Sequence, residues 1–221
     1  LKKIFRDSLD CYNNGQLEEA TRLCLDYLEA QPNSYRANYN LGLFLGDQEQ
    51  FTEADKALKK ALTINPDFVS TYCALGNNLI KQGLLEEAEN YLRKALKLDP
   101  NHVHSHFNLA MLLLLQGNYS KGWIEYRWRL KRKDLPYNKH PSPEWKGQPL
   151  ENKTLLIVAE QGMGDMIQCL RFIKQLKADG TLIIVEAHKP LISLLKACID
   201  IDLIVPHSTP FPDADYYIPI L

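Results

Sequence analysis

The sequence predicts an α-helical solenoid of about four repeats, followed by part of an α/β domain. One observation is a fixed interval: prolines recur 34 residues apart, at Pro32, Pro66 and Pro100. The other is a change of pattern at Thr154, where short continuous apolar runs begin to alternate with amphipathic segments. Such runs are typical of parallel strands that are buried on both faces of a doubly wound sheet.

The repeat interval also governs the leucines and the small residues of the first part of the chain. In the third repeat, apolar residues at spacings of three and four predict a first helix that ends at Gly83, and a second that ends at Asp99 and Pro100. Small residues are expected where the two helices cross closely. They form two columns: Ala20, Ala54, Ala88 and Gly122, and Gly42, Gly76 and Ala110.

This period and this pairing of helices resemble the tetratricopeptide repeat, a helix–turn–helix unit that buries its apolar face by stacking on copies of itself. The resemblance covers residues 1–134 and implies a curved array whose concave face is lined by the first helices. We therefore expect a peptide-binding groove on that face. Its predicted residues are Tyr39, Asn40, Leu43, Asn77, Phe107, Asn108 and Met111.

Two asparagines occupy one repeat column of the predicted groove, Asn40 and Asn108, together with Arg6 and Ala74. This region resembles the O-linked N-acetylglucosamine transferases, which carry asparagines in that column to hold a peptide backbone. An amide suits this task because it donates and accepts hydrogen bonds at once. The alternative is that both asparagines are ordinary solvated positions on a helix face.

The array is expected to end in an aromatic helix at residues 122–129, which caps the last repeat. A proline-rich linker follows at residues 135–153, because a segment with so many prolines is neither helix nor central strand. Trp145 is expected to anchor this linker to a surface. Residues 154–221 then form the partial α/β domain, which we expect to be Rossmann-like.

The α/β segment begins with a strand at residues 154–159, which is followed by a glycine turn. A helix is expected next, marked by Met166, Leu170, Ile173 and Leu176. The remaining elements are expected in the order strand, helix, strand, strand. Their predicted positions are residues 182–185, 190–198, 201–205 and 216–220.

The glycine turn does not fit a dinucleotide-binding fingerprint. The position of the third glycine is Ile167, and Asp165 would repel a pyrophosphate at the start of the helix. Glu186, at the end of the second strand, falls roughly where a ribose-binding acid belongs. We nevertheless expect no nicotinamide or other cofactor.

Residues from Gly122 through this turn resemble bacterial proteins that fuse tetratricopeptide repeats to a heptosyltransferase-like glycosyltransferase of the GT-B type. The resemblance implies that Asp165 is the general base for an acceptor hydroxyl, and that the turn binds the acceptor. A carboxylate suits this role because it removes the proton from a poor nucleophile. The alternative role of Asp165 is a helix N-cap. The turn residues are Glu160, Gln161, Gly162 and Gly164.

Two functions are therefore open. One is a protein-interaction scaffold joined to the acceptor-side part of a glycosyltransferase, in a longer parent protein that transfers sugar from a nucleotide sugar to a glycan or protein. The other is a non-catalytic peptide-binding scaffold with a structural α/β segment. We expect residues 1–221 alone to be inactive, and the edge of the incomplete sheet to permit self-association.

Composition and charge exclude several further classes of partner and site. A formal net charge of −1 gives no electrostatic footprint for nucleic acid. Five cysteines without a C-x-x-C pair predict reduced thiols in a cytoplasmic protein. No apolar run is long enough to span a bilayer. We expect no metal site, because His102, His104 and His106 lack further ligands at a suitable spacing.

Overall fold

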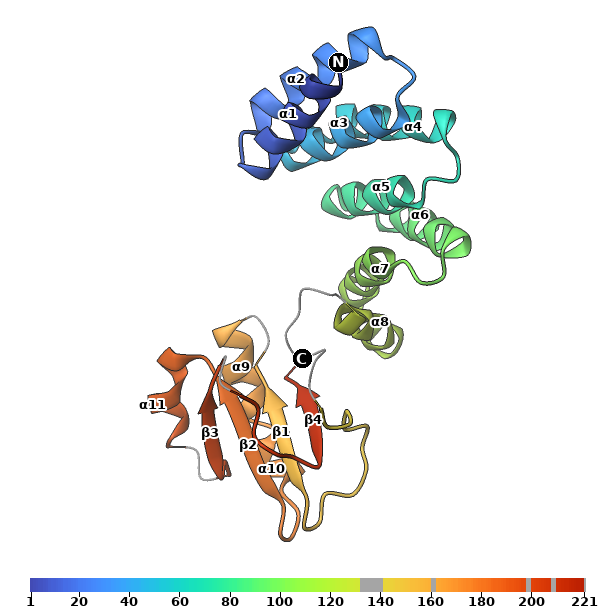
Figure 1. The fold of residues 1–221 in the computed structure, drawn as a ribbon. Coiled ribbons are helices and arrows are strands. Elements are labelled where there is room, and N and C mark those ends of the chain that lie inside the picture. Colours follow the sequence, from blue (N-terminus) through green and yellow to red (C-terminus); the bar gives the residue numbers. More distant parts are fainter. Residues whose placement is uncertain (132–140, 160–161, 198–199, 208–209, 221) are drawn as a thin grey trace. The chain divides into compact units, whose positions relative to one another are not determined.

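The computed structural model describes residues 1–131, 141–159, 162–197, 200–207 and 210–220. The chain divides into two compact units, Leu1–Arg132 and Lys133–Leu221. Figure 1 shows helices throughout the first unit, and a sheet with short helices in the second. Each unit has its own hydrophobic core.

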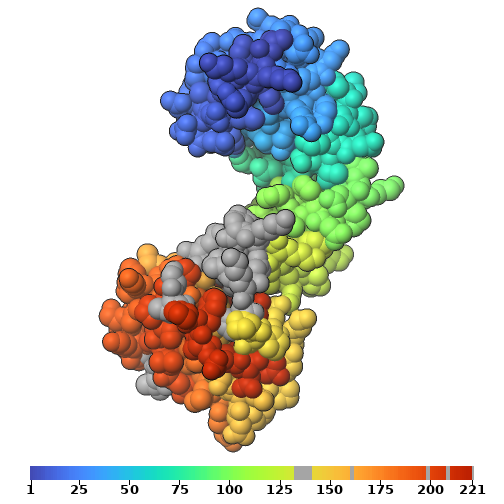
Figure 2. All heavy atoms as spheres, in the orientation of Figure 1, coloured from blue at the N-terminus to red at the C-terminus, as the bar shows by residue number. Residues whose placement is uncertain are grey.

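The N-terminal unit consists of helices that pack in antiparallel pairs, and neighbouring pairs form one continuous surface on the face shown in Figure 2. A short 3₁₀ helix, Arg127–Lys131, follows the last pair. The helices are α1 (Lys2–Asn13), α2 (Leu17–Ala30), α3 (Tyr35–Asp47), α4 (Phe51–Ile64), α5 (Val69–Lys81), α6 (Leu85–Leu98), α7 (Val103–Leu115) and α8 (Tyr119–Tyr126).

The two helices of each pair approach closely at the predicted columns of small residues. A Cβ atom added at Gly42 would lie 2.5 Å from the side chain of Leu58, and one added at Gly76 would lie 2.6 Å from that of Leu92. The other column is fully buried, with Ala54 inaccessible to solvent. The small residues are therefore required by the helix crossing, as the sequence predicts.

A left-handed residue ends the first helix of each pair. It is a glycine in three repeats, with φ between +76° and +77° at Gly15, Gly83 and Gly117, but it is Glu49 in the second repeat, with φ of +59°. The next residue donates its N–H to a carbonyl five residues back, as Leu84 does to Leu79 over 2.9 Å. This pairing closes a helix at a left-handed position.

Two thiols lie in the core of the N-terminal unit. Cys24 and Cys73 are buried and free, and burial raises the pKa of Cys24 to about 12. These thiols therefore stay protonated at neutral pH. Within the described residues, no helix is both long enough and apolar enough to cross a membrane.

The C-terminal unit contains a small sheet of four parallel strands in the order β3-β2-β1-β4. Short helices α9 (Met163–Leu170), α10 (Ile173–Leu176) and α11 (Ile192–Leu195) connect the first three strands, and a 3₁₀ turn, Lys189–Leu191, precedes α11. The strands are β1 (Thr154–Val158), β2 (Leu182–Ala187), β3 (Leu203–Pro206) and β4 (Tyr216–Pro219).

The helix expected from Met166 to Leu176 is divided into α9 and α10. At the break, the N–H of Phe172 bonds to the carbonyl of Cys169, three residues back, over 3.0 Å. This tighter turn changes the direction of the chain, and Phe172 remains 46% exposed. The prediction of one continuous helix was therefore wrong at this point.

The outer edge of β4 is partly covered by the linker. Trp145 donates its N–H to the carbonyl of Tyr217 over 2.8 Å, and Tyr217 donates to the carbonyl of Pro143 over 3.1 Å. Pro143 suits this edge because it accepts a hydrogen bond and needs no donor of its own. The Trp145 ring packs against the core of the unit. The linker thus covers part of one edge of the sheet, and self-association through an open edge stays a prediction.

The left-handed residue that ends the first helix of each pair gives a test of the repeat geometry. We expect Glu49→Gly to stabilise the N-terminal unit by about 0.5–1 kcal/mol, because relief of the left-handed strain exceeds the extra chain entropy of glycine. The matched reverse change, Gly83→Glu, should destabilise it by a similar amount. Urea unfolding followed by far-ultraviolet circular dichroism measures both variants, and a loss of stability in Glu49→Gly would contradict the assignment.

Candidate functional site

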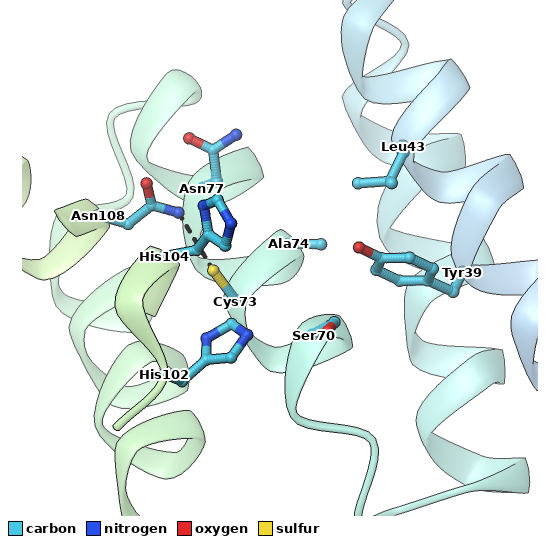
Figure 3. Close-up of a pocket in the computed structure, with 9 residues that line it drawn as sticks. All are labelled: Tyr39, Leu43, Ser70, Cys73, Ala74, Asn77, His102, His104 and Asn108. Atoms are coloured by element: carbon cyan, nitrogen blue, oxygen red, sulfur yellow. Dashed lines mark hydrogen bonds between the residues drawn. The ribbon is translucent and has the colours of Figure 1, made fainter. Parts of the chain in front are cut away.

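A cavity of about 320 Å³ opens on the side of the N-terminal unit that is formed by the first helices of successive repeats. Figure 3 shows side chains from α3, α5 and the start of α7 converging on it. Its lining residues are Tyr39, Leu43, Ser70, Cys73, Ala74, Asn77, His102, His104 and Asn108.

The cavity exists because α5 presents small side chains where its neighbours present larger ones. Ser70, Cys73 and Ala74 lie one repeat after Arg36, Tyr39 and Asn40, respectively. Equivalent residues of stacked repeats follow one another across the array, so a run of small side chains on the middle helix leaves a hollow between the flanking helices. The third repeat therefore forms the floor, and α3 and α7 form the walls.

The polar groups of the cavity are amides, hydroxyls and imidazoles. Asn108 donates its side-chain N–H to the sulfur of Cys73 over 3.4 Å, and Asn77 is exposed. Tyr39 packs edge-on against Phe68, and burial raises the pKa of its hydroxyl. Among the described lining residues there is no carboxylate, ammonium or guanidinium group. The cavity therefore suits an uncharged ligand segment.

Four of the predicted groove residues line the cavity, namely Tyr39, Leu43, Asn77 and Asn108. The other three, Asn40, Phe107 and Met111, lie outside its lining. Phe107 instead packs near Tyr126 of α8, with ring centroids 5.8 Å apart. Sequence reasoning missed the floor as a feature, although comparing side-chain size down each repeat column would have revealed it.

Of the three histidines near the start of α7, His104 lines the cavity, and the other two have structural roles. His102 is the N-cap residue, and its Nδ1 accepts the backbone N–H of Ser105 over 3.3 Å. The Nε2 atom of His106 lies 2.9 Å from the carbonyl of Pro100, and its ring stacks on Trp128 at 3.6 Å. Within the described ranges, no group of three or more potential ligands is arranged for a metal ion.

The role of His106 follows from the repeat register. Two repeats earlier in the array, Asn38 donates its side-chain N–H to the carbonyl of Pro32 over 3.3 Å. His106 stands two repeats after Asn38, and its contact with Pro100 is the equivalent one. The second ring nitrogen lies 2.5 Å from the carboxylate of Glu125. The histidine therefore ties the interhelical turn to α7 and to α8.

In the C-terminal unit, the glycine turn leads from β1 into α9. Gly162 is the N-cap residue of α9, and Asp165 lies in the first turn of that helix. The suggestion that Asp165 is the N-cap is therefore wrong. Its carboxylate lies against Gly162, because a Cβ atom built there would be 2.4 Å from Oδ2. The other predicted turn residues, Glu160 and Gln161, lie outside the described residues.

The space around Gly164 is open. A Cβ atom added there would meet no other atom within 4 Å. The turn also stands at the carboxyl end of β1, which lies between β2 and β4 in the sheet. The chain reverses its direction of strand addition at this point, and ligands of open α/β sheets bind at such positions. A ligand can therefore approach the backbone of Gly164 next to Asp165.

Glu186 is not presented to a ribose. Its side chain is 3% exposed, and its Oε1 lies 3.2 Å from Nδ1 of His207. The carboxylate is therefore turned into the protein instead of toward a cofactor. This placement agrees with the absence of a third glycine in the turn at Ile167.

Family models of the tetratricopeptide repeat match residues 35–68, 69–102 and 91–123. The curated "Tetratricopeptide repeat protein 37" of Xenopus laevis is 31% identical over 77 residues, which are 35% of this chain and 5% of that protein. Tetratricopeptide repeats are therefore present, and the N-terminal unit is a helical solenoid of the kind that serves as a protein-interaction scaffold.

Two solved structures share the fold at low identity. A mutant O-GlcNAc transferase of Thermobaculum terrenum is 21% identical, with a TM-score of 0.57, and the match covers 92% of this chain and 40% of that one. MamA of Desulfovibrio magneticus RS-1 is 20% identical, with a TM-score of 0.53, and the match covers 59% and 73% of the two chains. The chain thus spans less than half of the transferase.

The capping role of His102 predicts a pH dependence. Burial lowers the pKa of this imidazole, and the neighbouring His104 and His106 act in the same direction, while Asp99 opposes them. The unfolded chain therefore takes up the proton first as the pH falls below the ordinary histidine value of about 6.5. Consequently, the free energy of unfolding of the N-terminal unit should decrease as the pH is lowered through that range.

The control for this pH effect is His102→Asn, which keeps a good N-cap and removes the titrating group. Urea unfolding between pH 7.5 and pH 5 should give a shallower loss of stability for His102→Asn than for the parent chain. Equal slopes for the two proteins would contradict the role of His102 in the pH dependence.

Proposed function

We propose that the N-terminal unit binds an extended, uncharged peptide segment in the cavity formed by α3, α5 and α7. The observation that carries this proposal is the cavity itself, with its small floor at Ala74 and its amides from Asn77 and Asn108. Amides that donate and accept can bind a peptide backbone without selecting its sequence. The hollow over Ala74 selects one apolar side chain of the peptide by size.

The absence of a cationic group in the described lining distinguishes this site from one built for acidic peptide tails. The nearest ammonium on α5, Lys81, forms an ion pair with Asp47 over 3.3 Å. Asp47 also accepts a hydrogen bond from Tyr12 over 2.5 Å. A carboxylate ligand would therefore find no ammonium or guanidinium partner among the described lining residues.

Two substitutions test the peptide site. Ala74→Leu should abolish binding by filling the hollow, and Asn108→Ala should weaken binding by about 1–3 kcal/mol through a lost hydrogen bond at a partly desolvated site. Asn40→Ala is the matched control, because Asn40 occupies the same repeat column but lies outside the cavity lining. Binding is measured by fluorescence polarisation with peptides selected from a random display library on the parent chain. Peptides that bind all the variants equally would contradict the site.

A second function concerns the C-terminal unit, and we infer that it is the acceptor side of a glycosyltransferase in a longer protein. Two observations support this inference. The turn at Gly162 and Gly164 leaves open space beside Asp165 at the carboxyl end of β1. The fold likeness to the O-GlcNAc transferase also extends over 92% of the chain, beyond the repeat array.

The proposed chemistry assigns one step to Asp165. Its carboxylate accepts the proton of an acceptor hydroxyl while the oxygen attacks the anomeric carbon of a nucleotide sugar, and the diphosphate leaves with the electrons of the broken bond. The acceptor lies on the turn at Gly162 and Gly164. The peptide site of the repeats then recruits the protein that carries the acceptor, or a partner of the enzyme.

Asp165→Asn tests this assignment in the longest natural form of the protein. Turnover should fall by roughly 10²–10⁴, because asparagine cannot accept the proton. Unfolding should change little, since asparagine has nearly the same shape as aspartate and Asp165 is not the N-cap residue of α9. Transfer of a radiolabelled sugar from uridine, guanosine and adenosine diphosphate sugars to a protein or glycan acceptor is the measurement.

Gly164→Ala is the companion variant for the same assay. It should raise helix stability by about 0.5–1 kcal/mol, because alanine is the better helix former and its Cβ meets open space. It should nevertheless raise KM for the acceptor, whose approach the new methyl group obstructs. Parent-level activity in both variants would contradict the roles given to Asp165 and Gly164, and no transfer by the parent protein would favour the non-catalytic scaffold.

A further inference from the structure

A buried carboxylate lies at the end of β2, on the face of the sheet away from the helices. Val185 and Ala187 belong to the core beneath α9, α10 and α11, and side chains alternate along a strand, so Glu186 points to the opposite face. Its side chain is only 3% exposed. Neither the repeats nor the turn at Asp165 accounts for this buried charge.

The partner of Glu186 is His207, the residue that follows β3. The backbone N–H of His207 donates to the carbonyl of Ala187 over 2.8 Å and so extends the pairing of β2 with β3 by one residue. Glu186 stands opposite Val205, and His207 lies two residues further along the same face. This register brings Nδ1 of the imidazole to 3.2 Å from Oε1 of the carboxylate.

The contact with Glu186 decides which ring nitrogen of His207 carries the proton. Within the described part of the chain, Nδ1 of His207 and Oε2 of Glu186 are buried and accept or donate no hydrogen bond, so the 3.2 Å contact between Nδ1 and Oε1 is the only polar contact that Nδ1 makes there. A buried carboxylate is costly unless it is paired, so the ring proton belongs on Nδ1, which faces the carboxylate. The ring is 30% exposed, which leaves Nε2 as an unprotonated acceptor on the accessible part of the side chain.

We propose that Nε2 of His207 accepts a hydrogen bond from a hydroxyl group of a sugar, with Glu186 as the residue that positions the ring. The subsite lies at the carboxyl edge of the parallel sheet, where ligands of open α/β folds bind. The ring of His188 lies 5.1 Å from that of His207 and forms an adjoining wall. The inference rests on the proposed glycosyl transfer for the identity of the ligand, and on the geometry alone for the acceptor atom.

The charge of the pair favours a hydroxyl group over an anion. If His207 is protonated, its positive charge is balanced by Glu186 at 3.2 Å, so an anion gains little net attraction. A neutral imidazole repels an anion with the same lone pair that accepts a hydroxyl proton. A sugar hydroxyl, which donates one hydrogen bond and carries no charge, fits both conditions.

The protonation state is tested first, on the 221-residue chain, by two-bond ¹H–¹⁵N correlation of the imidazoles at pH 7.5, with His207→Gln to assign the signal. We expect the Nδ1–H tautomer for His207 and the Nε2–H tautomer, the usual form in water, for the exposed His104. In Glu186→Ala, His207 should revert to Nε2–H. If that variant does not fold, the parent spectrum still decides, because an Nε2–H tautomer of His207 there overturns the proposal.

Ligand binding is tested by titrating the same sample with methyl α-glucopyranoside, methyl N-acetyl-β-glucosaminide and inorganic phosphate. A saturable shift of the His207 Nε2 signal with either glycoside, absent for His104, supports the subsite. A shift with phosphate alone, or with none of the three, overturns it. The failures of the two proposals are distinguishable: a saturable glycoside shift in the 221-residue chain, together with no transferase activity of the longer parent protein, leaves the subsite intact and removes the proposed transfer.

Discussion

The close crossing of two helices within each repeat is the constraint on which the N-terminal unit depends. Leu58 and Leu92 fill the space that a side chain at Gly42 or Gly76 would occupy. This contact sets the distance between the paired helices, and it repeats at the same interval along the chain. Equivalent residues of successive first helices therefore lie in rows across one face, and the size of the residues in each row decides whether that face is flat or hollow.

The binding cavity follows from this geometry without any specialised loop. Serine, cysteine and alanine on α5 replace the larger Arg36, Tyr39 and Asn40 of the preceding repeat. Three neighbouring positions therefore carry small side chains on the same helix, and the cavity lies above them. A solenoid can change its ligand by altering side-chain size at such positions while the helix crossing stays the same. The His106 contact with Pro100 shows the complementary case, in which a residue of functional appearance replaces Asn38 in a structural bond.

Most of the repeat fold was predictable because a period constrains many residues at once. The strand order was less accessible, yet the buried apolar runs located all four strands of the sheet. Features that depend on one residue were missed. Glu49 adopts a left-handed conformation that nothing in its side chain indicates, and its position is evident only from the glycines of the other repeats. The linker pairing of Pro143 and Trp145 with β4 was missed because a proline-rich segment carries no strand pattern.

The candidate site of the C-terminal unit shows why residue type alone underdetermines function. Two acidic residues stand near the carboxyl ends of neighbouring strands, and the sequence offers a ligand role for each. The backbone separates them: Asp165 lies in an open first turn beside Gly164, whereas Glu186 is buried and faces His207. A carboxylate in the open turn can meet a ligand directly, while a buried one can act only through the ring that it orients. Burial therefore decides which residues at this sheet edge a ligand can reach, and in the proposed subsite Glu186 acts through the imidazole of His207.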